Sequence, residues 1–139
     1  MSDSTANTPA HDGAVLDRLL AALSAGDLDA LQTCCTADVV FWHSFDQIPQ
    51  NFEEAARGFE QFFAGFPERL FVDARRAAIP DGFMQQHLMV GVTASGKRLA
   101  WPICVVVRLR EGLVTRYEEY IDRAGSYAVA EGDFVTRGL

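Results

Sequence analysis

Two segments near the start of the chain have apolar residues at helical spacing. The first begins at Ala14 and carries the apolar positions Val15, Leu16, Leu19, Leu20 and Leu23. Gly26 suits the left-handed conformation that ends a helix, and Asp27 can cap the helix that follows. That second helix is short and buries Leu28 and Leu31.

A third helix is predicted after a loop that contains Pro49. Asn51 and Glu54 have the spacing of a reciprocal capping pair. Behind them lies an apolar stripe of helical period that ends before Pro67: Phe52, Ala55, Ala56, Phe59, Phe62, Phe63 and Phe66. We expect this stripe to pack against a sheet, and some of its rings could form a pocket wall.

The remaining segments are typical of strands. Residues 38–43 alternate in a β-rich run, and residues 71–79, 83–93, 99–110 and 113–122 are separated by glycine-containing turns. Pro102 within the fourth of these runs indicates a bulge or an unpaired stretch. The order predicts an α+β domain in which a strongly curved antiparallel sheet forms a cone closed by three helices. We expect the domain to span residues 11–125, between a disordered tail (1–10) and a C-terminal extension (126–139).

Composition and charge narrow the possible partners. The net charge of −7 disfavours nucleic acid, and no apolar run is long enough to cross a bilayer. The first ten residues lack the basic start and apolar middle of a signal peptide, so we expect a cytoplasmic protein. Three cysteines and three histidines without metal-ligand spacing predict reduced thiols and no metal site.

Two stretches carry a resemblance to a known superfamily. Residues 21–31 read AALSAGDLDAL, and residues 111–114 lead through EGLV into RYEEYID at residues 116–122. Both resemble the superfamily of ketosteroid isomerases, SnoaL-like polyketide cyclases and limonene epoxide hydrolases, which share the nuclear-transport-factor-2-like cone. The resemblance implies a cavity for a small hydrophobic ligand, no cofactor, and a homodimer formed through sheet faces.

Matching positions within this resemblance identifies candidate residues. His43 falls where the isomerases have their aspartate base, whereas Leu19 and Cys104 replace the two donors of their oxyanion hole. Glu119 falls where the epoxide hydrolases carry a catalytic aspartate, and Gln86 and Leu88 replace the charged residues of their preceding strand. Neither steroid isomerisation nor epoxide opening by the family's own mechanism is therefore expected.

Strand alternation extends the candidate set. If His43 faces the cavity, so does Phe41; if Glu119 does, so do Tyr117 and Ile121. A slip of one residue would instead present Tyr120 and Asp122, and a bulge in the strand predicted at residues 83–93 would present His87 in place of Gln86.

The hypothesis is a cofactor-independent acid–base enzyme for a small, mostly apolar carbonyl- or hydroxyl-bearing molecule: an isomerase, a dehydratase or hydratase, or a cyclase. His43 would be the general base and Glu119 the partner acid, or the reverse. Tyr117 and Gln86 would orient the ligand, while Leu19, Phe41, Cys104 and Ile121 would supply the apolar wall. The alternative is a non-catalytic module that binds a small molecule or a protein.

Overall fold

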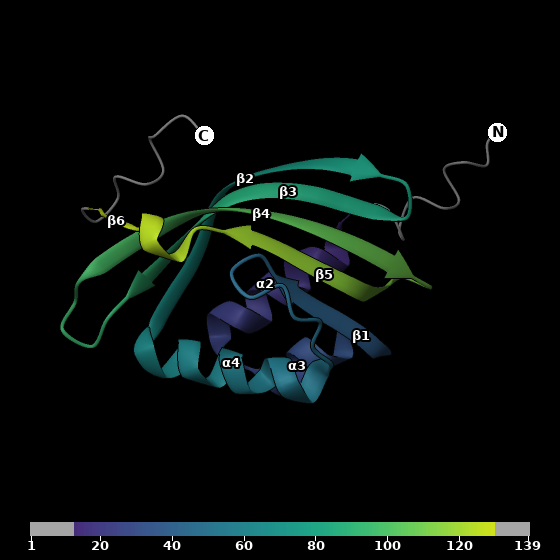
Figure 1. Ribbon diagram of the computed structural model, residues 1–139, viewed down its shortest axis with the longest axis horizontal. Coiled ribbons are helices and arrows are strands. Elements are labelled where there is room, and N and C mark those ends of the chain that lie inside the picture. The colour runs from purple at the N-terminus through teal and green to yellow at the C-terminus, as the bar shows by residue number, and fades with distance from the viewer. Residues whose placement is uncertain (1–12, 130–139) are drawn as a thin grey trace.

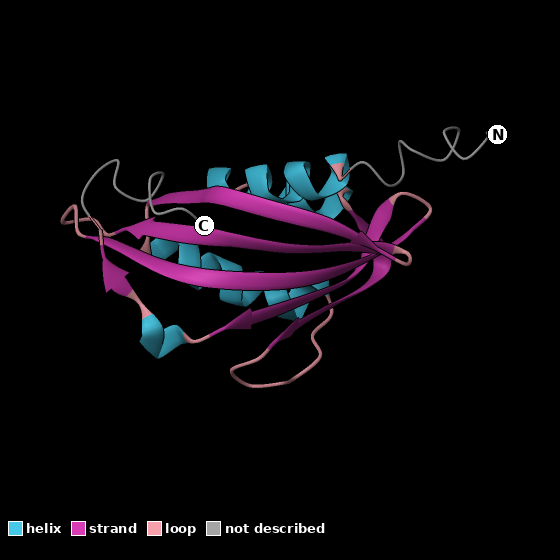
Figure 2. Ribbon diagram, turned by 90° about the horizontal axis from the view of Figure 1, so that it is seen from above, coloured by secondary structure: helices cyan, strands magenta, loops and turns pink. Residues whose placement is uncertain are grey.

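The computed structural model describes residues 13–129, in which three helices pack against one face of a curved sheet. The helices are α2 (Ala14–Ala25), α3 (Leu28–Thr33) and α4 (Phe52–Gly65). The strands are β1 (Cys35–His43), β2 (Glu68–Ile79), β3 (Gly82–Val92), β4 (Arg98–Arg110), β5 (Leu113–Ile121) and β6 (Tyr127–Ala128), and the 3-10 helix η2 (Arg123–Gly125) precedes β6. The sheet arches over the helices (Figure 1), and its convex face, seen from above, has no described helix on it (Figure 2). The predicted α+β cone is confirmed.

The sheet is mixed. Its strand order is β1-β5-β4-β3-β2, and β2 to β5 form the predicted antiparallel meander. The prediction of a wholly antiparallel sheet is corrected at β1, which starts three residues earlier than expected and pairs with β5 in parallel. The reason is topological: hairpins make sequence neighbours antiparallel, whereas β1 and β5 are joined through α4 and the whole meander.

Local sequence signals set the helix ends as expected. Gly26 ends α2 with φ 71°, and the Asp27 carboxylate accepts a 3.0 Å hydrogen bond from the Ala30 N–H at the start of α3. At α4, the side chains of Asn51 and Glu54 each accept a 2.9 Å hydrogen bond from the other's backbone N–H. These bonds satisfy N–H groups that have no partner within the helix.

The pleat of the strands divides the sheet into an inner face, which meets the helices, and an outer face on the convex side. Fully buried residues on the helices and on the inner face form the main core, among them Leu16, Leu19, Leu31, Phe41, Val105 and Val107. Pro102 occupies a stretch of β4 that is unpaired on one side, because the pairing with β6 reaches only Ala100 and that with β5 starts at Ile103.

Part of the predicted C-terminal extension joins the sheet. Tyr127 and Ala128 pair with β4, and Val129 is buried against Leu88 and Val90 on the outer face. The predicted tail (1–10) and residues 130–139 lie outside the described residues. The domain boundary near residue 125 stays a prediction.

A buried arginine joins the C-terminal ends of two helices. The Arg69 side chain of β2 donates hydrogen bonds to the carbonyl oxygens of Leu23 and Ser24 in α2, both at 2.9 Å. It also donates to those of Phe63 and Phe66 at the end of α4, at 3.4 and 2.6 Å. Carbonyls at helix C-termini lack intrahelical partners and carry partial negative charge, so one cation satisfies both ends.

We expect Arg69→Leu to lower the free energy of unfolding by about 2–4 kcal/mol, because several buried carbonyls lose their donor. Arg69→Lys keeps the charge but reaches fewer carbonyls, and should lose about half as much. Arg75→Leu, at an exposed position of the same strand, should change stability by less than about 0.5 kcal/mol. Urea unfolding of the three variants measures this, and an Arg69→Leu protein as stable as the Arg75→Leu control would contradict the proposed role.

Candidate active site

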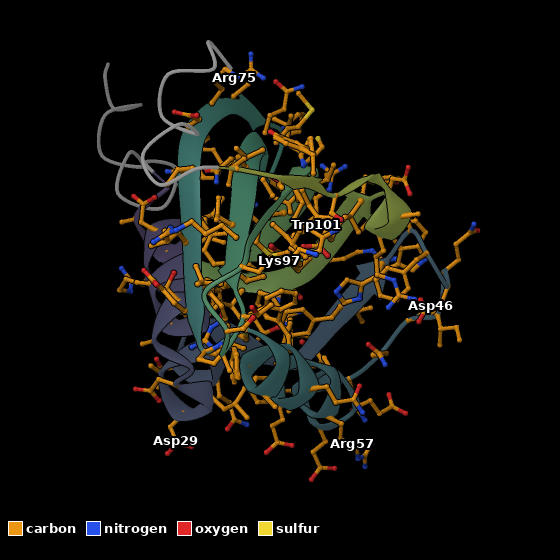
Figure 3. All side chains as sticks on the ribbon, turned by 90° about the vertical axis from the view of Figure 1, so that its left-hand side faces the viewer. Asp29, Asp46, Arg57, Arg75, Lys97 and Trp101 are labelled. Atoms are coloured by element: carbon orange, nitrogen blue, oxygen red, sulfur yellow. The ribbon has the colours of Figure 1, made fainter. Side chains whose placement is uncertain are left out.

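A cavity of about 790 Å³ lies between α4 and the inner face of the sheet. Its wall is mainly apolar and aromatic, with contributions from α2 (Leu23), α4 (Phe59, Phe62), the residue after α4 (Phe66), β2 (Phe71), β3 (Met89), β4 (Trp101) and β5 (Tyr117, Ile121). Most polar groups lie at the ends of β1 and β5 and in the segments that follow them, and one lies on α4: His43, Asp46, Gln50, Glu119 and Arg123, with Gln61 on the helix. In Figure 3, Asp46 lies on a loop that projects at the right-hand edge of the domain. A concave apolar cavity with few polar groups is the usual form of a small-molecule site.

The pairing of β1 with β5 places His43 beside Glu119. The two residues are register partners in this parallel pair, as are Phe41 and Tyr117 two positions earlier. His43 Nε2 lies 3.6 Å from Glu119 Oε1, and the two side chains are 14% and 15% exposed. This separation is longer than a hydrogen bond, so both groups keep bonding capacity for a ligand.

Ser44 secures the strand ends just beyond this pair. Its backbone N–H donates to the Glu119 carbonyl at 2.9 Å. Its hydroxyl accepts from the Ile121 N–H at 3.0 Å and donates to the Ile121 carbonyl at 3.1 Å. The Ser44 side chain thus continues the hydrogen bonding to β5 beyond the end of β1. Together with the Ser44 N–H, it holds the backbone of β5 at Glu119 and at Ile121.

Burial disfavours the charged form of both polar groups. It raises the pKa of Glu119 from 4.5 to about 7. Burial also lowers the pKa of His43 below 6.5, with the Arg123 charge acting in the same direction and the Asp46 charge opposing it. Although the two groups are close enough for an ion pair, below about pH 7 burial favours a neutral imidazole beside a carboxylic acid over that pair.

The other predicted pocket residues divide into two groups. Tyr117 and Ile121 line the cavity, and burial raises the pKa of Tyr117 well above 10, so its hydroxyl stays protonated. Phe41 and Leu19 are fully buried and do not line it. Phe41 supports the wall from behind, with its ring centroid 5.3 Å from that of Phe59 and 5.7 Å from that of Tyr117.

Gln86 and Cys104 are register partners on the outer face, so their predicted place in the cavity is wrong. The inner positions are held by their sequence neighbours Gln85, His87 and Ile103, which are buried. The physical cause is the two-residue period of a strand, in which a displacement of one position moves a side chain to the other face. The alternatives Tyr120 and Asp122 lie outside the cavity: Tyr120 is 47% exposed against Trp42 on the outer face, and Asp122 caps η2.

His87 reaches the inner face without a bulge in β3, since the irregularity lies in β2. Arg76 Nε donates to Gln85 Oε1 at 2.8 Å, and Gln85 Nε2 contacts His87 Nδ1 at 3.0 Å. Because the amide nitrogen can only donate, His87 Nδ1 accepts, and its proton is on Nε2. Burial, followed by the Arg76 charge, lowers the pKa of His87 to about 4, so the ring is neutral.

The sequence reasoning did not identify Trp101, Phe45 or Arg123 as cavity residues. The alternation that makes Ile103 inward also makes Trp101 inward, so the pattern contained this signal once the register was right. Phe45 and Arg123 lie on connecting segments that have no period. Within residues 13–129, no group of three or more His, Cys, Asp or Glu side chains is placed to hold a metal ion. No helix in that range has the length and apolar character needed to span a membrane.

Fold and site together define a cone-shaped α+β domain with a polar pair inside an apolar cavity. The sequence matches the SnoaL-like domain family over residues 16–117, and the chain belongs to this family. No curated protein matches it.

Several solved structures are similar in fold. IdmH from Streptomyces antibioticus, a proposed polyketide cyclase, has a TM-score of 0.72 and 16% identity, with 81% of this chain and 92% of that chain covered. An LEH-like epoxide hydrolase from M. tuberculosis has a TM-score of 0.64 and 19% identity, with 83% of this chain and 84% of that chain covered. An NTF2-like protein of unknown function from Burkholderia pseudomallei has a TM-score of 0.67 and 13% identity, covering 79% and 89%. At these identities the likeness shows the shared fold.

The raised pKa of Glu119 predicts a stability difference that depends on pH. In the unfolded chain Glu119 ionises near pH 4.5, whereas in the folded protein it ionises only near pH 7. The free energy of unfolding therefore falls as the pH rises through this range, and above about pH 7 the loss is complete. Glu119→Gln cannot ionise, so its stability relative to the wild type should rise by about 2–3 kcal/mol across this window. Glu118→Gln, one residue away on the outer face, should show no such rise. Denaturant unfolding at several pH values measures both, and parallel curves for wild type and Glu119→Gln would contradict the assignment.

Proposed function

We propose that this protein is a cofactor-independent acid–base enzyme that acts on a small, mostly apolar carbonyl- or hydroxyl-bearing molecule. The supporting observation is the 3.6 Å approach of His43 to Glu119 inside an apolar cavity. Isomerisation, dehydration or hydration, and aldol-type cyclisation all require one proton to be removed and another to be returned. Two groups with opposite pKa shifts, placed side by side, can perform both transfers.

The pKa directions support a division of roles. Near pH 7 the neutral imidazole of His43 can accept a proton from the substrate, and the carboxylic acid of Glu119 can deliver one to the developing oxyanion or leaving hydroxyl. The reverse assignment needs ionised Glu119 as the base, and this form predominates only above its pKa of about 7. Tyr117, which stays protonated, offers a further donor in the wall.

A non-catalytic binding module is the second candidate. It is favoured by the placement of Leu19 in the core and Cys104 on the outer face. Neither residue can donate a hydrogen bond into the cavity, so the two positions that supply the isomerases' oxyanion hole in the family resemblance supply none here. Retained ligand binding without proton transfer would identify this second function.

We also propose that the protein forms a homodimer through the outer faces of its sheets. Met84 and Tyr120 on this face are 39% and 47% exposed, and Tyr120 packs against Trp42 with ring centroids 5.2 Å apart. Burying such a patch against a second copy would remove apolar surface from water. The cytoplasmic location expected from the first ten residues stays a prediction.

The dimer proposal predicts twice the monomer mass by light scattering at micromolar concentration. Tyr120→Glu places a charge in the patch and should shift the protein to monomer, because a charge buried without a partner is strongly disfavoured. Glu118→Gln on the same face should not cause this shift. A monomeric wild type would overturn the proposal.

The catalytic proposal can be tested without knowing the substrate, by measuring deuterium exchange next to a carbonyl. The wild-type protein is incubated with cyclohexanone or 2-tetralone in D₂O, and deuterium uptake is followed by NMR. His43→Ala and Glu119→Gln should each lower the catalysed exchange by about 10²–10⁴-fold. Glu118→Gln is the matched control and should keep the wild-type rate.

The pH profile separates a mechanism that uses both groups from one in which ionised Glu119 acts as the base without an acid from His43. With His43 as base and Glu119 as acid, the rate should be bell-shaped, falling below the lowered pKa of His43 and again above the pKa of Glu119 near 7. With ionised Glu119 acting as the base and no proton required from His43, the rate should instead rise through pH 7 to a plateau. Full activity in either variant would overturn that residue's role, and binding of 2-tetralone without exchange would favour the binding module.

A further inference from the structure

Three side chains form a stack at the polar side of the cavity. The rings of His43 and Phe45 are stacked, with centroids 5.1 Å apart and planes 27° apart. The Arg123 guanidinium carbon lies 3.8 Å from the centroid of the same Phe45 ring. All three residues line the cavity. The stack therefore links a fixed positive charge to the imidazole of the candidate pair.

The backbone at Arg123 is anchored from two sides. Trp101, itself a cavity residue, donates from its indole Nε1–H to the Arg123 carbonyl at 3.1 Å. The Asp122 carboxylate accepts from the Ala124 N–H at 3.1 Å and caps η2. With the main chain held and the guanidinium resting on Phe45, little conformational freedom is left to be lost when a ligand binds.

The Arg123 guanidinium has unused capacity to bind an anion. Among residues 13–129, no carboxylate lies within ion-pair distance of it. Within the described part of the chain, no other lysine or arginine lines the cavity. A planar guanidinium beside an apolar space binds a carboxylate through two parallel N–H···O bonds, a geometry that a neutral amide cannot match.

The two acidic residues of the cavity do not neutralise this site. Glu119 is largely protonated below pH 7 because burial raises its pKa to about 7. Asp46 lies on the projecting loop (Figure 3), where its carboxylate accepts the Ile48 N–H at 3.1 Å. Asp46 therefore disfavours an anion beside its own loop, whereas Arg123 on η2 attracts one. This asymmetry orients a bound acid.

We propose that the substrate carries a carboxylate, which Arg123 binds while the apolar body of the molecule fills the cavity. The distances from Phe45 place the guanidinium carbon within about 9 Å of the His43 ring centre. An acid bound there has its reacting atom only a few bonds from the carboxylate. The substrate class is thus a small cyclic or aromatic carboxylic acid with a carbonyl or hydroxyl group near the acid group. The position of the reacting atom rests on the proposed function, whereas binding of the acid does not.

The proposal is tested with two probes of the same shape, 2-naphthylacetate and 2-naphthylacetamide, at pH 6.5. Isothermal titration calorimetry should show the wild type binding the acid at least about tenfold more tightly than the amide. Arg123→Gln should abolish this preference by weakening the acid alone. Arg123→Lys, which keeps the charge but loses the two-point geometry, should be intermediate, and Asp46→Asn should strengthen acid binding.

Arg75→Gln is the matched control, since it removes the same charge from an exposed position far from the Asp46 loop (Figure 3). It should leave the preference unchanged, and thermal unfolding should show that Arg123→Gln remains folded. Equal affinity for the two probes, a preference that survives in Arg123→Gln, or no detectable binding of either probe at millimolar concentration would overturn the proposal. A preference that depends on Arg123 in a protein without deuterium exchange would uphold acid binding while rejecting the proposed catalysis.

Discussion

The parallel pairing of β1 with β5 is the constraint on which the candidate site depends. It sets Phe41 beside Tyr117 and His43 beside Glu119, with both pairs facing the helices. Because strand side chains alternate, a slip of one residue in either strand would separate the imidazole from the carboxyl group. Ser44 opposes such a slip, because its hydroxyl forms hydrogen bonds with both the N–H and the carbonyl of Ile121.

The helical layer that closes the cavity depends on a second, electrostatic constraint. Arg69 donates to carbonyls at the ends of both α2 and α4, so it holds two helices to one point of β2. Leu23 on α2 and Phe66 after α4 supply two of those carbonyls and also line the cavity. The same bonds that satisfy the helix ends thereby fix part of the wall that a ligand would contact.

Much of this arrangement follows from local sequence. Gly26, Asp27 and the Asn51–Glu54 pair set helix ends through bonds within a few residues. Alternation pairs Phe41 with His43 once one of them is known to face inward. The pattern fails at Gln85, Gln86 and His87, because three consecutive polar residues give no apolar face by which to choose a register. The roles of Arg69 and Ser44 could not be predicted, since each depends on partners more than 40 residues away along the chain.

The site separates its charged groups from its neutral ones. Inside the cavity, burial favours the uncharged form of both members of the His43–Glu119 pair, which reduces the cost of enclosing them and leaves one proton available for transfer. On the connecting segments around it, Asp46 and Arg123 lie at exposed positions, where water can hydrate a charge. The carboxylate of a bound acid would pair with Arg123 without being buried among the phenylalanine rings. The apolar wall would then contact only the uncharged body of the ligand, so no charge would have to be desolvated there.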